Sequence, residues 1–97
     1  ATNIMGKIIV NDGAKEAIIN NQKSLLSIGI TGVEGEFKRG EIISLVDSNN
    51  EEFARGISSY NSSDINKIKG CHSDKICQIL GYKFDDDVVI KDNLVVI

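Results

Sequence analysis

The sequence predicts a mainly β domain with small helices, closed into a small mixed barrel rather than built from alternating β–α–β units. Three observations support this fold class. Short stretches of strand-like residues recur along the chain, helical periodicity is confined to short segments, and the segment Ser24–Gly40 (SLLSIGITGVEGEFKRG) holds four of the nine glycines. A chain of 97 residues has room for one core, so we expect a single domain over residues 1–97.

The glycine-rich segment changes its apolar phase part of the way along. Apolar residues stand at even positions in Ile28 and Ile30, and at odd positions in Val33 and Phe37. A phase change at a glycine is typical of a β-bulge or a barrel corner, because one extra residue re-aims the side chains that follow. We therefore expect a β-bulge or a barrel corner near Thr31–Gly32.

The residues that follow predict a bent hairpin at the centre of the sheet. Lys38–Gly40 is a turn, and Glu41–Asp47 (EIISLVD) is the next strand. A third strand, Glu51–Tyr60, would pair with Glu41–Asp47, and Gly56 within it marks a bend or a close approach of another backbone.

The chain begins with a short strand and a helix. The strand is Gly6–Val10, and Asp12 is the expected N-cap of a helix over Ala14–Asn20. The residues of that helix expected to face the core are Ala14, Ala17 and Ile18.

Two further helical turns and two strands complete the chain. Ser62 would cap a turn that carries Ile65 and Ile68, and Ser73 would cap the segment Asp74–Leu80. The apolar face of this second segment would be Ile76, Ile79 and Leu80, with Gly81 as its left-handed C-terminal residue. The closing strands are expected at Asp87–Ile90 and Leu94–Ile97.

The two cysteines have a structural interpretation. Cys77 would be a small core residue on a helix, with Cys71 and His72 in the loop before it. A disulfide and a metal site remain alternatives, although the spacing fits no zinc template. The acidic run Asp85–Asp87 could hold Mg²⁺, but such loops are usually solvated surface.

Charge and composition bound the function. No phosphate-binding loop or catalytic constellation is present, so we expect no catalytic and no metal-binding residues. The apolar runs are too short for a membrane partner. A net charge of −3 disfavours tight nonspecific binding to nucleic acid, although a local basic patch remains compatible with it. The start, ATNIMG, suggests that residues 1–5 are the remnant of a linker from a longer chain.

Several fragments together resemble a known family. They run in the order Gly6, Asp12-Gly13-Ala14, Ser24-Leu25-Leu26, Gly29, Val33-Glu34-Gly35, Phe37, Arg39-Gly40, Ala54-Arg55-Gly56, Tyr60, Ile79-Leu80-Gly81-Tyr82 and Asp92-Asn93-Leu94. In order and spacing they resemble the PUA domain, in particular the one at the C-terminal end of bacterial glutamate 5-kinase. The likeness implies a PUA-like mixed-sheet pseudo-barrel. The departures are Ser27 in place of Pro, Glu41 in place of Asp, and Ile90-Lys91 in place of His-Arg.

The resemblance implies an accessory or regulatory domain of a cytoplasmic enzyme. Glutamate 5-kinase phosphorylates glutamate with ATP and magnesium in the first step of proline biosynthesis, and proline inhibits it. Those sites belong to an amino-acid-kinase domain outside this chain, so the fragment alone should have no activity and no cofactor. Its partners would be that kinase domain and neighbouring subunits.

Two alternatives remain beside this hypothesis. PUA domains of other proteins bind tRNA or rRNA between the first helix and the strand that follows it. By position, that groove would involve Lys15, Lys23, Ser24 and Gly29. The other alternative is a protein-interaction domain with an unrelated role.

Overall fold

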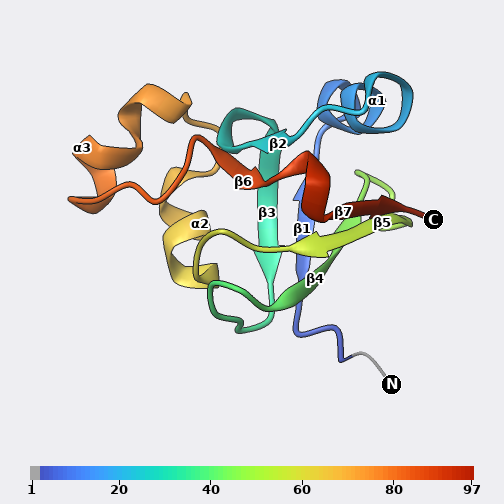
Figure 1. Cartoon of the computed structure of the whole chain (residues 1–97), viewed down its shortest axis with the longest axis horizontal. Coiled ribbons are helices and arrows are strands. Elements are labelled where there is room, and N and C mark those ends of the chain that lie inside the picture. The colour runs from blue at the N-terminus through green and yellow to red at the C-terminus, as the bar shows by residue number, and fades with distance from the viewer. Residues whose placement is uncertain (1–2) are drawn as a thin grey trace.

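The computed structural model describes residues 3–97, which fold around a five-stranded mixed sheet and a small two-stranded sheet (Figure 1). The strands are β1 (Lys7–Val10), β2 (Leu25–Leu26), β3 (Ile30–Glu34), β4 (Ile42–Val46), β5 (Glu52–Ile57), β6 (Asp87–Val89) and β7 (Leu94–Val96). The α-helices are α1 (Asp12–Asn21), α2 (Ser62–Ile68) and α3 (Ile76–Leu80), and the 3₁₀ turns are η1 (Ser27–Gly29), η2 (Ser73–Lys75) and η3 (Lys91–Asn93). The predicted fold class, mainly β with small helices, is confirmed.

The order of strands in the large sheet is β3-β1-β4-β5-β7, and the small sheet pairs β2 with β6. The predicted central hairpin is therefore wrong, because β1 lies between β3 and β4 and pairs with β4 in parallel. The chain leaves the sheet at Gly35, whose φ of +85° ends β3. Phe37 then packs into the core with only 4% of its surface exposed. In the middle of the sheet, Ile8 and Val10 of β1 are fully buried.

Of the two expected alternatives, a bulge or a barrel corner near Thr31–Gly32, the structure shows a bulge at Thr31. In the β1–β3 ladder Ile9 pairs with Gly32 and Val10 pairs with Ile30, so Thr31 is the extra residue. The shift of apolar residues from even to odd positions follows from this bulge, because the extra residue moves the following side chains to the other face.

The pairing of the next two strands also agrees with the sequence. β4 and β5 form an antiparallel pair, although β5 stops at Ile57 and is shorter than the expected strand over Glu51–Tyr60. Gly56 is a site of close approach, since a Cβ there would lie 2.5 Å from Val89 Cγ1. The sheet thus packs directly against β6 at this point.

The helix caps lie one residue before the predicted ones, and α1 starts at Asp12, two residues before the predicted Ala14. Asn11, not Asp12, caps α1, and its Oδ1 accepts a hydrogen bond from the Ala14 N–H at 2.8 Å. Asn61 occupies the cap position of α2, while Ser62 Oγ accepts a hydrogen bond from the Phe37 N–H at 3.1 Å. Where two adjacent residues can both cap a helix, as in Asn11-Asp12 and Asn61-Ser62, tertiary contacts decide which of them is the N-cap. His72, not Ser73, precedes the turn that leads to α3.

The helical faces are confirmed for α2 and only partly for α1 and α3. Ile65, Ile68 and Ile76 are fully buried, and Ile18 of α1 is 2% exposed. Ala14 and Ala17 are half-buried, and Ile79 is 40% exposed. Gly81 has the expected left-handed conformation at the end of α3, with a φ of +83°.

The expectation that Cys77 is a core residue is wrong. Cys77 is exposed and Cys71 is half-buried, and both are free thiols. The helix α3 has five residues and lies at the periphery, so only one of its sides reaches the core (Figure 1). Cys71 and His72 precede it in a loop, as predicted.

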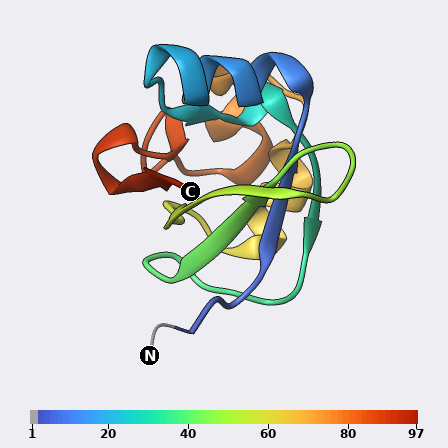
Figure 2. The same cartoon turned by 90° about the vertical axis from the view of Figure 1, so that its right-hand side faces the viewer.

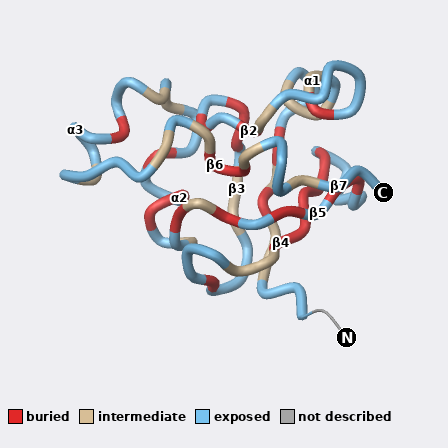
Figure 3. Tube along the Cα trace, viewed as in Figure 1, coloured by how far each residue is buried: buried red, intermediate tan, exposed pale blue. Residues whose placement is uncertain are grey.

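One core fills the space between the large sheet, the small sheet and α2 (Figure 3). Twelve of its sixteen buried residues are Ile, Leu or Val, and the others are Phe37, Phe53, Ala54 and Tyr60. Tyr60 is fully buried in it, and its hydroxyl donates to the Asp85 carbonyl. Because its ring is fully buried, Tyr60 packs in the core and is not exposed for stacking on a base. Figure 2 looks onto β4 and β5, with α1 above them and α2 and α3 behind. No helix within residues 3–97 has the length and apolar character needed to cross a bilayer.

Candidate functional site

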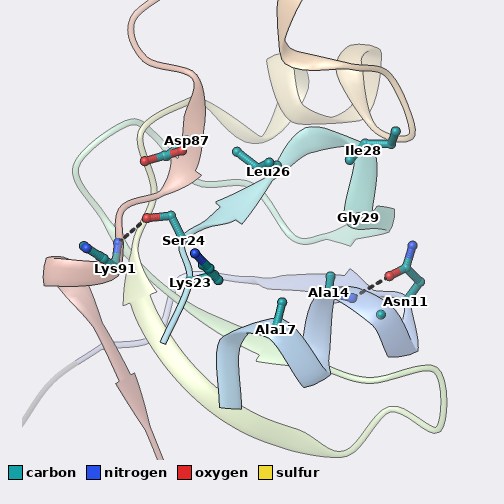
Figure 4. Close-up of a pocket in the computed structure, with 11 residues that line it drawn as sticks. Asn11, Ala14, Ala17, Lys23, Ser24, Leu26, Ile28, Gly29, Asp87 and Lys91 are labelled. Carbon is teal, nitrogen blue, oxygen red and sulfur yellow. Dashed lines mark hydrogen bonds between the residues drawn. The ribbon is translucent and has the colours of Figure 1, made fainter. Parts of the chain in front are cut away.

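A cleft of about 550 Å³ opens beside α1, where β2 and η1 meet the start of β6 and the start of η3 (Figure 4). Apolar side chains form part of its wall, among them Ala14, Ala17, Leu26 and Ile28. Leu26 and Ile28 are each 41% exposed, which is high for large apolar residues next to a core. The cleft therefore offers an apolar surface to a ligand or partner.

Gly29 allows α1 to lie close to η1 at one side of this cleft. A Cβ on Gly29 would lie 2.6 Å from the Cβ of Ala14, well inside van der Waals contact. The Gly29 carbonyl also accepts a hydrogen bond from the Asn11 N–H at 2.9 Å, directly before the helix. Packing alone thus requires a glycine at this position.

Lysines approach the cleft from two distant parts of the chain. Gln22 ends α1 in a left-handed conformation, with a φ of 53°, and turns the chain so that Lys23 and Ser24 line the cleft. Ser24 Oγ accepts a hydrogen bond from the Lys91 N–H at 2.8 Å, which fixes the start of η3 beside β2 (Figure 4). Lys23 and Lys91 are therefore both cleft residues, opposed by one acid, Asp87.

Three of the four residues expected in an RNA groove line this cleft, and Lys15 does not. Lys15 Nζ lies 2.7 Å from Asp47 Oδ2, in an ion pair that ties α1 to the end of β4. The hydrogen bond from Lys15, followed by that from the Glu51 N–H, lowers the pKa of Asp47. The same hydrogen bond raises the pKa of Lys15. Because its charge is compensated by Asp47, Lys15 has a structural role.

The sequence did not lead to Lys91, Leu26 or Ile28 as cleft residues. Lys91 comes from the far end of the chain and reaches the cleft only because β6 pairs with β2. One signal was available, since Lys91 stands where the family pattern has Arg, and a basic residue is retained there. The strand β2 has only two residues, which is too short for a reliable pattern.

The remaining polar groups offer little reactive chemistry. Asp86 forms an ion pair with Lys83, and Asp85 Oδ1 accepts a hydrogen bond from the Asp87 N–H at 2.8 Å. Within residues 3–97, no three His, Cys, Asp or Glu side chains are grouped so that they could hold a metal ion. The arrangement in the cleft, lysines beside an apolar wall, is suited to binding rather than to bond making.

Comparisons with known proteins agree with this architecture. The family model of the PUA domain matches residues 6–80. Glutamate 5-kinase of Dictyoglomus thermophilum is 45% identical over 92 residues, which are 95% of this chain and 25% of that protein. Glutamate 5-kinase of Rippkaea orientalis is 52% identical over 89 residues, which are 92% of this chain and 24% of that protein. The chain thus spans about a quarter of the length of these relatives, and the matches fall in their C-terminal portion.

Solved structures share the fold at low sequence identity. A PUA domain of Aeropyrum pernix K1, in complex with tartrate, has a TM-score of 0.62 at 21% identity over 88% of this chain and 41% of that chain. A chain of an archaeal box H/ACA sRNP complex has a TM-score of 0.59 at 18% identity over 91% of this chain and 26% of that chain. The mixed-sheet fold, the family model over residues 6–80 and the similar solved structures all indicate the same family. The chain belongs to the PUA domain family.

Proposed function

We propose that this chain is the non-catalytic accessory domain of a glutamate 5-kinase, in which it acts on regulation or assembly. The observation that carries the proposal is the identity of 45% to glutamate 5-kinase over 95% of the chain. Fold likeness alone would not justify it, because one fold serves many functions.

The chemistry of the chain is consistent with an accessory role. The Ser24 hydroxyl in the cleft bonds to a backbone N–H rather than to a base that could activate it. The relatives have about three quarters of their length outside the matched region. We therefore assign ATP, magnesium and glutamate to that larger part, and we place the domain in the cytoplasm with the enzyme.

A truncation experiment tests the accessory role. In the full-length protein that carries this chain, deletion of residues 6–97 should leave ATP-dependent phosphorylation of glutamate measurable and should change its inhibition by proline or the oligomeric state. The fragment of residues 1–97 should phosphorylate no glutamate by itself. A truncated enzyme with unchanged proline inhibition and unchanged assembly would contradict the proposal.

RNA binding is the second candidate, and the cleft is the feature that favours it. Lys23 and Lys91 supply positive charge beside an apolar surface, and a chain from a ribonucleoprotein complex shares the fold. The net charge of −3 opposes it. Binding of tRNA in a filter assay should weaken steeply with salt and fall in Lys23→Glu and Lys91→Glu. Lys67→Glu on α2, an exposed lysine away from the cleft, is the charge-matched control. An absence of binding at low salt would remove this candidate.

A further inference from the structure

On the face of the large sheet that points away from the core, apolar side chains lie where β4 begins and β5 ends. In β4, Ile43 and Leu45 are fully buried in the core. Because side chains alternate along a strand, Ile42 and Ser44 point to the opposite face. Ile42 pairs with Ile57 of β5, so these two side chains lie next to each other on that outer face.

The segment that leads into β1 lies beside Ile42. The Met5 N–H donates to the Ile42 carbonyl at 2.9 Å. Lys7 pairs with Ser44, so Met5, two residues before Lys7, shares the outer face with Ile42. Ile57 is 37% exposed and Met5 41%, while Ile42 is half-buried. We call Met5, Ile42 and Ile57 the entry patch. Isolated exposed apolar side chains are ordinary, but adjacent ones at one end of a sheet indicate a contact surface.

Paired charges border the entry patch. The next row across the sheet joins Glu34, Lys7, Ser44 and Arg55 by their strand pairing. Lys7 Nζ lies 3.7 Å from a Glu34 carboxylate oxygen, and Arg55 lies 3.1 Å from Glu52. An apolar centre with a polar border of balanced charge is typical of a contact between protein domains, and it is unlike a surface for nucleic acid.

The position of the patch suggests which partner covers it. The chain enters the fold at this end, and α1, which the cleft adjoins, lies at the opposite end (Figure 1). The relatives have about three quarters of their length outside the matched C-terminal portion, so in them a larger domain precedes this point. A domain attached just before Ile4 and Met5 would have the entry patch within immediate reach.

We propose that the entry patch is the docking surface for the catalytic domain that precedes this domain in a glutamate 5-kinase chain. The inference rests on the function proposed above. In this arrangement the outer face of β4 and β5 is covered, and the cleft stays open at the far end. The domain thereby holds a fixed orientation instead of moving freely on a linker.

Photo-cross-linking in the full-length protein tests this surface. Benzoylphenylalanine is placed at position 57 and, as a matched control, at position 79 on α3, where the isoleucine is 40% exposed. Within one chain, the yield of cross-links to residues preceding Ala1 should be about tenfold higher from position 57 than from position 79. This ratio is expected if the docked form is populated about ten times more than the undocked form. Equal yields would overturn the proposal, and so would cross-links that join only two separate chains, which would assign the patch to a second copy.

A second measurement avoids reliance on the cross-linker. Ile57→Glu should increase the rate at which a protease cuts the segment before Gly6 by about tenfold. In the docked form the new carboxylate would be buried without a partner, so the two domains would separate more often and expose that segment. Ile79→Glu should leave that rate unchanged. If position 57 cross-links to the preceding domain but deletion of residues 6–97 leaves proline inhibition and assembly unchanged, the docking surface stands and the regulatory function fails. If deletion changes them but position 57 yields no such cross-link, the regulatory function stands and the docking surface is wrong.

Discussion

The contact between Gly29 and Ala14 allows a quantitative test of how α1 is held against the cleft. A Cβ at Gly29 would lie 2.6 Å from Ala14 Cβ, while its other near neighbours are at 3.8 and 3.9 Å, which is ordinary contact. Gly29→Ala should therefore destabilise the fold by about 1–3 kcal/mol, as expected for overpacking at a single atom pair. Ala14→Gly should cost about 1 kcal/mol, mainly from helix propensity.

The two substitutions together should cost less than their sum. Removal of the Ala14 methyl makes room for the new Cβ at position 29, so the double variant should lose only about 1 kcal/mol. Urea unfolding of residues 1–97, followed by circular dichroism, measures all four free energies. Costs that add within about 0.5 kcal/mol would refute the reasoning, because non-interacting sites behave in that way.

A second glycine provides the matched control. A Cβ at Gly32 would lie 3.1 Å from Ile9 Cδ1, the flexible end of a side chain. Gly32→Ala should therefore cost less than Gly29→Ala, because Ile9 can move aside while Ala14 is fixed on its helix. The same denaturation assay applies.

Three other substitutions have expected outcomes. Ser27 is fully buried and donates to the Cys71 carbonyl at 2.6 Å, so Ser27→Ala should lower the free energy of unfolding in urea by about 1 kcal/mol. Asp47 has a lowered pKa in the fold, so its contribution to stability is present at neutral pH and is lost as the pH falls below 3.8, its ordinary value, through the folded pKa. Asp47→Asn should hence be less stable than the parent at pH 7, and thermal melts should show that difference shrinking in acid; a difference that grows in acid would be inconsistent with the ion pair to Lys15. Gly56→Ala would place a Cβ 2.5 Å from a valine methyl of β6, and it should lower the melting temperature more than Gly32→Ala does.

Local chemistry in the sequence was sufficient for several features of the fold. The bulge at Thr31 could be predicted because it changes the alternation of apolar and polar residues, and that alternation can be seen within a few consecutive residues. Gly81 ends α3 because a left-handed residue after a helix requires little more than the glycine itself. These features depend on neighbours in the chain, so a single sequence contains the information.

The pairing of β1 with β4 could not be predicted in the same way. Consecutive strands usually pair, and that rule favoured a hairpin between the segments now seen as β3 and β4. What excludes the hairpin is the insertion of β1, whose Ile8 is fully buried between them. No local pattern in Gly6–Val10 shows that this strand lies in the middle of the sheet. Lys91 was missed for the same reason, because only the β2–β6 pairing brings it to the cleft.

The cleft residues fall into two groups with different tests. Gly29 and Ser24 each have a structural task, one in helix packing and the other in holding the Lys91 N–H, so their identity gives no argument for a ligand. Among residues 3–97, the side chains of Lys23 and Lys91 form no hydrogen bond or ion pair, although both line the cleft. Charge reversal at these lysines should therefore leave the urea midpoint unchanged, while substitution of Gly29 lowers it. A loss of binding in the lysine variants at unchanged stability would thus report on recognition by the cleft, whereas a loss in a Gly29 variant would report on the fold.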